Sequence, residues 1–284
     1  MLRCNQEALV RVGAGAVISH PGQRGMYSVG FDDQPLIRPG MAGVTVNLRV
    51  GSPAFGWECD HGEPGVSAEG SDPASHLALQ VMACLGNPVR ALSGGAAGAS
   101  GVVTGKHAFV LIDFAPADLA LMSPGDRLLV ETCGQGLVLA DHPDVTCRNL
   151  SPELLQRLPA RASSDGSLEV EVVAELPPEV MGAGLGMSSE WANCDVMLHD
   201  RALVEQLGLP GLRLGDLVSM RDQDHRFGRS YRPGWTSIGV VVHALGPTPG
   251  HGVGVVTLMT APASRLRGQV TKQSNLRDLL ELPG

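Results

Sequence analysis

The sequence has little positive charge and few aromatic side chains. Its 284 residues include only two lysines, Lys106 and Lys272, and 21 Lys+Arg stand against 29 Asp+Glu, so the formal net charge is −8. Proteins that bind nucleic acids through backbone phosphates carry the opposite balance, and we therefore expect no nucleic-acid partner. Hydrophobic residues still make up 43% of the chain, which is enough to build a buried core and excludes general disorder.

Long hydrophobic runs are missing as well. The longest ones, such as residues 238–242, stop far short of the ~20 residues that a membrane-spanning helix needs. The N-terminal segment carries Arg3, Glu7 and Arg11, and glycines interrupt its apolar part, which is unlike a secretory signal. The six cysteines are scattered without a C-x-x-C pair, a pattern typical of buried, reduced thiols. We therefore expect a cytoplasmic protein with no membrane partner.

Glycine (37) and proline (20) are abundant, but no G-X-Y repeat of the collagen type is present. These residues therefore mark turns between short elements. Between the turns, alternating or short continuous apolar runs predict strands, and apolar residues at helical spacing predict helices. Strands are predicted at 9–19, 44–50, 107–114, 127–132, 135–139, 167–173, 217–220, 237–243 and 253–259. Helices are predicted at 75–85, 116–122, 151–158, 200–207 and 275–282.

The strands outnumber the helices and the two do not alternate strictly. This predicts a β-rich α+β fold with barrel-like or sandwich sheets and a few short helices. The polar segment 161–166 is the best candidate for a linker between an N-terminal β-rich half (1–160), which holds a glycine-rich loop, and a C-terminal β-rich half (167–284). One compact unit is the alternative. We expect a homo-oligomer on base rates alone.

The densest unusual feature is a glycine-rich stretch, SGGAAGASGVVTGKH, at residues 93–107. Glycines let a backbone approach a ligand closely and present its N–H groups, so Gly101 and Gly105 are candidate substrate contacts. Lys106 and His107 end the stretch and are candidate catalytic residues. It is not a Walker-type phosphate loop, because His107 stands where Ser or Thr must follow the lysine. A tight loop at a barrel corner is the structural alternative.

A second glycine-rich segment spans residues 181–200, MGAGLGMSSEWANCDVMLHD. Its G-x-G-x-G spacing follows a predicted short helix instead of a strand, so the sequence carries no nicotinamide or flavin signature. If a short strand begins at Asp195, that residue and His199 share one face of it. Asp200 is best explained as the N-cap of the following helix.

A third polar segment, residues 221–254, carries the candidate metal ligands. Asp222, Asp224 and His243 offer the carboxylate and imidazole groups that bind divalent ions, although their spacing matches no named motif. The sequence leaves the cofactor open, and a divalent metal is one that these residues could bind. His251 lies between two glycines, where it has little packing to do, and is a candidate catalytic residue.

The same segment offers groups for substrate recognition. Arg229 and Tyr231 lie in RFGRSYR and suit an anionic substrate group. A solvated hairpin loop explains them equally well. A fourth polar cluster, CDHGEPG at residues 59–65, contains Cys59, His61 and Glu63. Cys59 is a poor nucleophile candidate because catalytic partners seldom lie two residues apart, whereas His61 or Glu63 could belong to a site.

Several motifs in one order resemble an uncharacterised prokaryotic family, domain-of-unknown-function family 4438, over nearly the whole chain. The matching motifs are EPGVS (63–67), GNPVRALSGGAAGASGVVTGKH (86–107), PGDRL (124–128), MGAGLG (181–186), GDLV with D-x-D (215–224), GRSY (228–231), TSIGVVVH (236–243) and GHGVGVVTLMT (250–260). This resemblance implies no particular reaction. The Pro-Gly-Asp units and the Gly-His-Gly turn are more loosely similar to acetamidase/formamidase-type proteins, a likeness at the level of the fold.

These observations lead to three hypotheses. The first is an enzyme on a small polar molecule, most plausibly a metal-assisted hydrolase of an amide-like bond, in which His107, His251 and Asp222 or Asp224 hold the metal or transfer protons and Lys106 helps stabilise an oxyanion. The second is a metal-free lyase or isomerase with histidine acid and base. The third is a non-catalytic small-molecule-binding protein, in which the glycine-rich segments and His251 would lie far apart.

Overall fold

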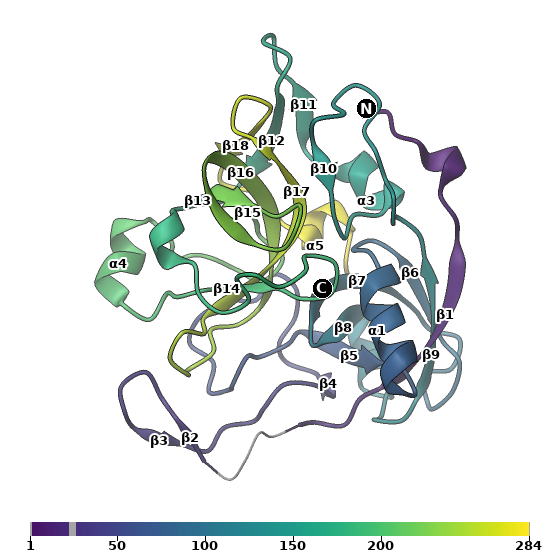
Figure 1. Cartoon of the computed structure of the whole chain (residues 1–284). Coiled ribbons are helices and arrows are strands. Elements are labelled where there is room, and N and C mark those ends of the chain that lie inside the picture. The colour runs from purple at the N-terminus through teal and green to yellow at the C-terminus, as the bar shows by residue number, and fades with distance from the viewer. Residues whose placement is uncertain (1, 23–26, 284) are drawn as a thin grey trace.

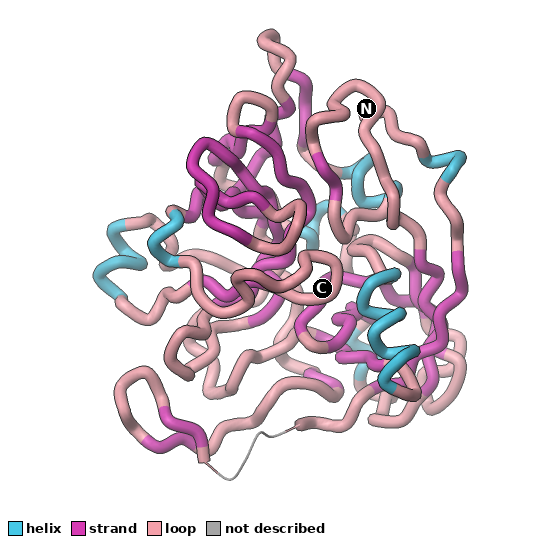
Figure 2. Tube along the Cα trace, in the orientation of Figure 1, coloured by secondary structure: helices cyan, strands magenta, loops and turns pink. Residues whose placement is uncertain are grey.

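The computed structural model describes residues 2–22 and 27–283, and strands form most of its regular structure (Figures 1 and 2). The N-terminal part is a barrel. Its sheet has the order β1-β9-β6-β7-β8-β5-β4, and an additional β1–β5 pairing closes a ring of antiparallel strands. The members are β1 (Val12–Ile18), β4 (Val44–Thr45), β5 (Gly65–Glu69), β6 (Pro88–Ala91), β7 (Ser100–His107), β8 (Phe109–Phe114) and β9 (Arg127–Thr132).

The C-terminal part contains the second large sheet, with the order β10-β17-β16-β15-β13 and β14 paired to β17. Its members are β10 (Thr146–Cys147), β13 (Ala174–Leu176), β14 (Cys194–Val196), β15 (Leu217–Asp224), β16 (Ser230–His243) and β17 (Val253–Pro262). A three-stranded sheet of β11 (Ala160–Ala162), β12 (Leu168–Val172) and β18 (Leu266–Val270) packs beside it, and β2 (Ser28–Val29) and β3 (Pro35–Leu36) form a separate hairpin. The prediction of a β-rich fold with barrel-like sheets is confirmed.

The helices are short, and polar side chains define where they begin. They are α1 (Pro73–Met82), α2 (Pro116–Leu119), α3 (Pro152–Arg157), α4 (Arg201–Gln206) and α5 (Leu276–Leu279), with 3-10 turns at Gln6–Ala8 and Pro178–Val180. The Ser151 side chain caps α3 and the Asp200 side chain caps α4, as the sequence predicts. No helix among the described residues is long and apolar enough to span a membrane.

The hydrophobic core is continuous between the two parts of the chain. One buried cluster joins Leu85 and Leu111 of the N-terminal part to Val242 and Leu258 of the C-terminal sheet. Gly105 lies in this contact, because a Cβ there would stand only 2.7 Å from Cγ1 of Val242. The missing side chain therefore lets β7 pack closely on β16, so that the ends of both strands lie near each other.

Three expectations about local structure are wrong. Residues 161–166 do not form a linker; they belong to β11 and the hairpin turn into β12, closed by the bond from Ser163 N to Ser167 O (2.8 Å). The glycine-rich stretch 93–107 is a loop only in its first part, because β7 begins at Ser100. The strands predicted at 44–50 and 135–139 shrink to β4 and to isolated bridges, since short apolar runs also occur in buried loops.

Candidate metal centre

Four histidines from distant segments of the chain meet where the two parts of the fold join. His61 precedes β5, His107 ends β7, His243 ends β16 and His251 precedes β17. The ring centroids of His107 and His243 lie 4.2 Å apart, and those of His61 lie 5.1 Å from His107, 5.0 Å from His243 and 4.8 Å from His251. We call these four residues with Asp195 the histidine centre.

Carboxylates from outside the histidine centre orient two of its four rings. Nδ1 of His61 lies 2.5 Å from Oδ1 of Asp60, and Nδ1 of His107 lies 2.7 Å from Oε1 of Glu63. A carboxylate at Nδ1 holds the proton there and makes Nε2 the nitrogen that can coordinate an ion, an arrangement that recurs around metal-binding histidines. His61 adopts a positive φ of 54°, which is uncommon outside glycine and concentrates at functional sites.

The third ring, that of His243, is oriented by backbone. Its Nδ1 donates to the carbonyl oxygen of Ala244 (2.8 Å), so that Nε2 faces Asn193 and Asp195. The Asn193 amide donates to His243 Nε2 (2.9 Å) and to Oδ1 of Asp195 (2.8 Å). Burial and the neighbouring His107 lower the pKa of His243 to about 4, so this imidazole is neutral, as a metal ligand must be.

Asp195, in β14, lies between the rings. Its Oδ1 is 3.2 Å from Nε2 of His243, and its Oδ2 is 2.8 Å from Nδ1 of His251 and 3.6 Å from Nε2 of His61. Burial raises the pKa of Asp195, but its interactions with His243, His251 and His61 outweigh burial and hold that pKa well below the usual range. The carboxylate is therefore ionised and supplies a negative charge inside a cluster of imidazoles.

Two other groups at the centre have shifted pKa values. Burial lowers the pKa of His61, but hydrogen bonds to Asp195 and Asp60 raise it to about 9. Burial raises the pKa of Glu63 to about 7, although the Ser67 hydroxyl and the Ala42 N–H donate to it. A metal ion at the centre would take the place of the proton on His61.

Two overlapping sets of donor atoms in the centre could each hold a metal ion. His61, His107 and His243 each offer a ring nitrogen, and these nitrogens lie within 4.8 Å of one another; His61, Asp195 and His251 form an overlapping set of the same kind. Imidazole nitrogens suit zinc and other late first-row metals, and three histidines with one carboxylate are a familiar ligand set for them. The orienting groups on Nδ1 complete the pattern.

A cavity of about 180 Å³, which we call the site cavity, opens onto this centre. Its lining residues are His107, Ala108, Ala183, Gly184, Met187, Trp191, Ala192, Asn193, Asp195 and His251. His251 is the most accessible of the four rings, with 30% of its side chain exposed, against 2% for His61 and 0% for His243. The three segments that meet at this cavity are the end of β7, residues 183–193 and the turn before β17.

Two glycines in the last of these segments allow the close packing. A Cβ on Gly252 would stand 1.8 Å from the carbonyl oxygen of Val196, and one on Gly254 would stand 2.1 Å from the His243 ring. Because Gly252 and Gly254 have no side chains, β17 can pack closely against β14 and against the histidine centre.

The structure brings together only some of the predicted site residues. His107, His251 and His243 belong to the centre. Asp222 and Asp224 do not: Asp224 is paired with Arg226 and Arg232, and Oδ1 of Asp222 accepts from the backbone of Gly234. Both aspartates lie in the part of β15 that pairs with the start of β16, whereas His243 ends β16.

The predicted substrate contacts also lie outside the site cavity. Arg229 is fully buried, and its guanidinium donates to the carbonyl oxygens of Gly184 and Ala192 (3.1 Å to Gly184), so it holds the cavity wall from behind. Tyr231 is 61% exposed and does not line the cavity. A Cβ on Gly101 would contact Phe114 at 2.7 Å, so this glycine, like Gly105, serves packing.

Lys106 is buried on the opposite side of β7 from His107. Its Nζ donates to Oδ1 of Asn149 (2.7 Å) and to the carbonyl oxygen of Glu190 (2.6 Å), and burial lowers its pKa to about 8. It therefore supports the segment beside the site cavity without lining it. Cys59 is not one of the centre's donors, and burial raises the pKa of its thiol.

Sequence reasoning considered His61 and Glu63 only as alternatives and assigned Asp195 no role. Asp60 and Asn193 were missed. Asp195 is the middle residue of a three-residue strand in a glycine-rich region, and only the pairing of Asp195 with Gly254 across β14 and β17 aims its carboxylate at the rings. Two features of the sequence could have pointed to Asp195: an acidic residue in a short predicted strand, and the separate G-H-G turn at residues 250–252 that could pack against it.

Fold and centre together define a β-rich protein with a closed barrel, a second sheet and a buried histidine–carboxylate centre at their junction. The chain belongs to the DUF4438 family: the model described as "Domain of unknown function (DUF4438), N-terminal" matches residues 27–156, and its C-terminal counterpart matches residues 157–280. The resemblance noted in the sequence is thereby confirmed. The crystal structure of TM1086 is similar to this chain, with 38% identity over 98% of both chains and a TM-score of 0.94. No curated protein matches the sequence.

Proposed function

We propose that this protein is a metal-dependent enzyme that hydrolyses an amide-like bond in a small molecule bound in the site cavity. His61, His107 and His243 would hold a divalent ion, with Asp195 as the charged ligand. The observation that carries the proposal is that the three rings are each bound at Nδ1 to an acceptor and each bring a ring nitrogen within 4.8 Å of the others. Independent folding constraints seldom orient three buried imidazoles in this way.

The residues of the centre divide the chemistry between them. The ion would activate water and polarise the carbonyl group of the substrate. Asp195 binds Nδ1 of His251 at 2.8 Å and orients that ring at the wall of the site cavity. The accessible face of His251 can then take a proton from the attacking water and return it to the leaving amine, which is the role of a general base and acid.

A metal-free lyase or isomerase is the second candidate, because His251 and Asp195 form a dyad that could transfer protons without an ion. The orienting groups on His61, His107 and His243 favour the metal-dependent enzyme, since acid–base chemistry needs no such set of three. A purely binding role is less well supported, because the glycine-rich segments and His251 surround one cavity.

Metal analysis of the purified protein tests the proposal. We expect about one equivalent of zinc or another late first-row ion, lost in His107→Ala and His243→Ala. The matched control is His142→Ala, which removes a buried histidine outside the centre and should keep its metal. His251→Gln should also keep its metal but lose activity toward amides. Folded wild-type protein that neither contains nor binds a divalent ion would refute the metal-dependent mechanism and leave the acid–base enzyme.

We also propose a cytoplasmic location and a homo-oligomeric assembly. All six cysteines are free, which suits a reducing compartment. The β2–β3 hairpin exposes Val29 and Phe31, each more than half accessible, and such apolar surface suits a contact between copies of the chain. Light scattering of the purified protein would test the assembly; a monomer at all concentrations would contradict it.

A further inference from the structure

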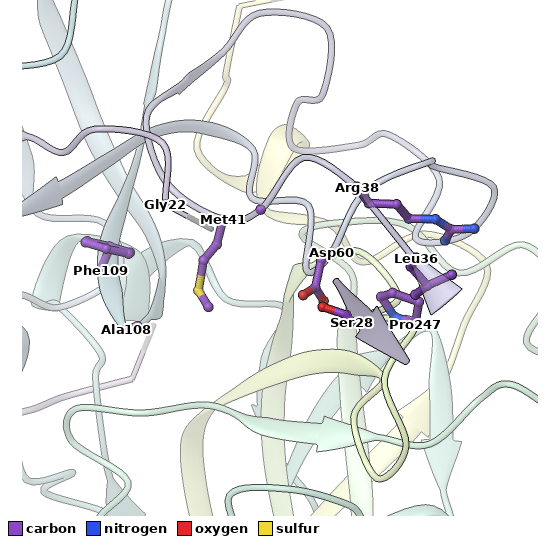
Figure 3. A pocket seen from close by; sticks show the side chains of 10 residues that line it. Gly22, Ser28, Leu36, Arg38, Met41, Asp60, Ala108, Phe109 and Pro247 are labelled. Carbon is purple, nitrogen blue, oxygen red and sulfur yellow. The ribbon is translucent and has the colours of Figure 1, made fainter. Parts of the chain in front are cut away.

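A second cavity, of about 300 Å³, adjoins the site cavity at the turn between β7 and β8. Ala108 lines both cavities. Its neighbours in the sequence each line one of them: His107 lines the site cavity and Phe109 lines the second cavity. Figure 3 shows Ala108 and Phe109 at one end of the second cavity and Leu36 and Arg38 at the other. We call this second space the tail cavity.

The two cavities differ in chemistry. The tail cavity is walled mainly by the apolar side chains of Leu36, Met41, Phe109 and Pro247, and among the described residues its charged groups come from Arg38 and Asp60. The site cavity carries the imidazoles and the Asp195 carboxylate of the centre. A polar reacting group therefore suits the site cavity, and a hydrocarbon chain suits the tail cavity.

The size of each space agrees with one ligand that uses both. Pockets for organic ligands commonly measure about 300–1,000 Å³, and the site cavity alone, at about 180 Å³, falls below that range. The tail cavity is large enough for an organic ligand, but of the groups around the centre it is lined by Asp60 alone among the described residues. Asp60 faces Nδ1 of His61, away from the cluster of donor nitrogens. A ligand in the tail cavity can react only if it also reaches past Ala108.

The turn between the cavities has unusual geometry. Ala108 adopts a positive φ of 52°, and its carbonyl oxygen lies 2.9 Å from Nε2 of His76, which holds the turn in place. Its side chain is a single methyl group, so little volume separates the two spaces. The hairpin that walls the tail cavity is bound to the loop of the centre, since Phe31 N donates to the carbonyl oxygen of Pro247 (2.9 Å), four residues before His251.

We propose that the substrate is amphipathic, with its reacting amide-like head at the histidine centre and an apolar tail that passes Ala108 into the tail cavity. This inference rests on the proposed function for the identity of the head. It narrows the substrate class from small polar molecules to amides that carry a hydrocarbon chain or ring.

The test uses two hydroxamates, which bind metal ions through the same head and differ only in their tails. Binding of acetohydroxamate and hexanohydroxamate to the zinc-loaded protein is measured by calorimetry. Each buried methylene contributes roughly a factor of four in affinity, so the four extra methylenes would give about 200-fold if all were buried and about 15-fold if half were. We expect hexanohydroxamate to bind at least about tenfold more tightly.

A matched pair of variants locates the tail. Leu36 lines the tail cavity, whereas the adjacent Ile37 is 68% exposed and does not. We expect Leu36→Asp to abolish the preference for the longer hydroxamate and Ile37→Asp to retain it, with acetohydroxamate binding unchanged in both. Met41→Asp serves as a second lining variant if Leu36→Asp does not fold.

The possible failures separate the two proposals. If neither hydroxamate binds the zinc-loaded protein, the metal centre itself is refuted. If both bind equally, or if the preference survives in Leu36→Asp and Met41→Asp, the centre stands and the tail cavity is not the site of the substrate's tail.

Discussion

Replacing Gly254 by alanine should destroy the proposed metal centre without changing any of its proposed ligands. A Cβ at this position would stand 2.1 Å from Cδ2 and Nε2 of the His243 ring, whereas ordinary contact begins at 3.4 Å, so the ring must retreat by about 1.3 Å. Coordination distances vary by only about 0.2 Å, and His243 is fully buried with no space to recover its position. We expect zinc affinity to fall by about 100-fold or more, beyond the usual effect of disturbing an orienting group.

Zinc affinity is measured by competition with a chelator, and stability by urea unfolding of the metal-free protein. Crowding of this kind costs about 1–3 kcal/mol of unfolding free energy. The control is Gly15→Ala, a strand glycine in β1 whose Cβ would meet no atom within 4 Å, and it should change neither quantity. Unaltered zinc affinity in Gly254→Ala would refute the reasoning, because it would mean that the position of His243 does not matter for binding.

A double variant separates crowding from general damage. In His243→Ala the ring that collides with the new Cβ is absent, so adding Gly254→Ala should cost well below the 1–3 kcal/mol expected in the wild type. Zinc binding should stay lost. An equal penalty in both backgrounds would show that the alanine acts on Asn193, 2.7 Å from the new Cβ, or on the backbone of β17, and not on the ring.

Three further predictions concern groups away from the ion. His225 is buried, and burial together with the nearby Arg229 lowers its pKa to about 3. Between pH 6.5 and 3 the unfolded chain binds more protons than the folded one, so this residue should lower the unfolding free energy as pH decreases, by about 2 kcal/mol at pH 5. His225→Asn should lack this contribution when guanidinium unfolding is compared at pH 7 and pH 5. Arg229→Met should remove the guanidinium donor from two cavity-wall carbonyls, of which Gly184 keeps its bond from Met187 N, and cost about 3 kcal/mol. Hydrogen exchange should become faster first at residues 184–193, and unchanged exchange there would contradict the role of the guanidinium. Asp200→Ala should lower the unfolding free energy by about 1 kcal/mol because α4 loses its N-cap, and Asp72→Ala should lower it by a similar amount at α1. If neither variant is less stable in urea unfolding, water replaces the capping side chains.

Local sequence signals predicted the regular elements well where polar residues and turns mark their ends. The strand expected at 127–132 is β9 to the residue, and the caps Ser151 and Asp200 begin α3 and α4. The strands that were missed, such as β6 and β7, contain Pro, Gly, Ser or Lys and have weak alternation. They form strands because their neighbours in the closed barrel supply backbone partners, which no local pattern encodes.

The candidate site shows the same division. Sequence reasoning selected His107, His243 and His251 because they end strands or stand among glycines. It placed Asp222 and Asp224 with them because these residues are close in sequence and chemically suitable. In the structure the two aspartates lie at the other end of the β15–β16 ladder, and Asp224 compensates two arginines.

By itself the sequence determined that this is a glycine-rich, acidic, β-rich chain whose polar residues collect at the ends of strands. Those properties depend on local patterns: composition, alternation and turn residues. Only the tertiary structure decided that His61, His107, His243, His251 and Asp195 form one centre. These residues come from segments up to 190 positions apart, and they meet because glycines such as Gly105 and Gly254 let β7, β16 and β17 approach more closely than any side chain would allow.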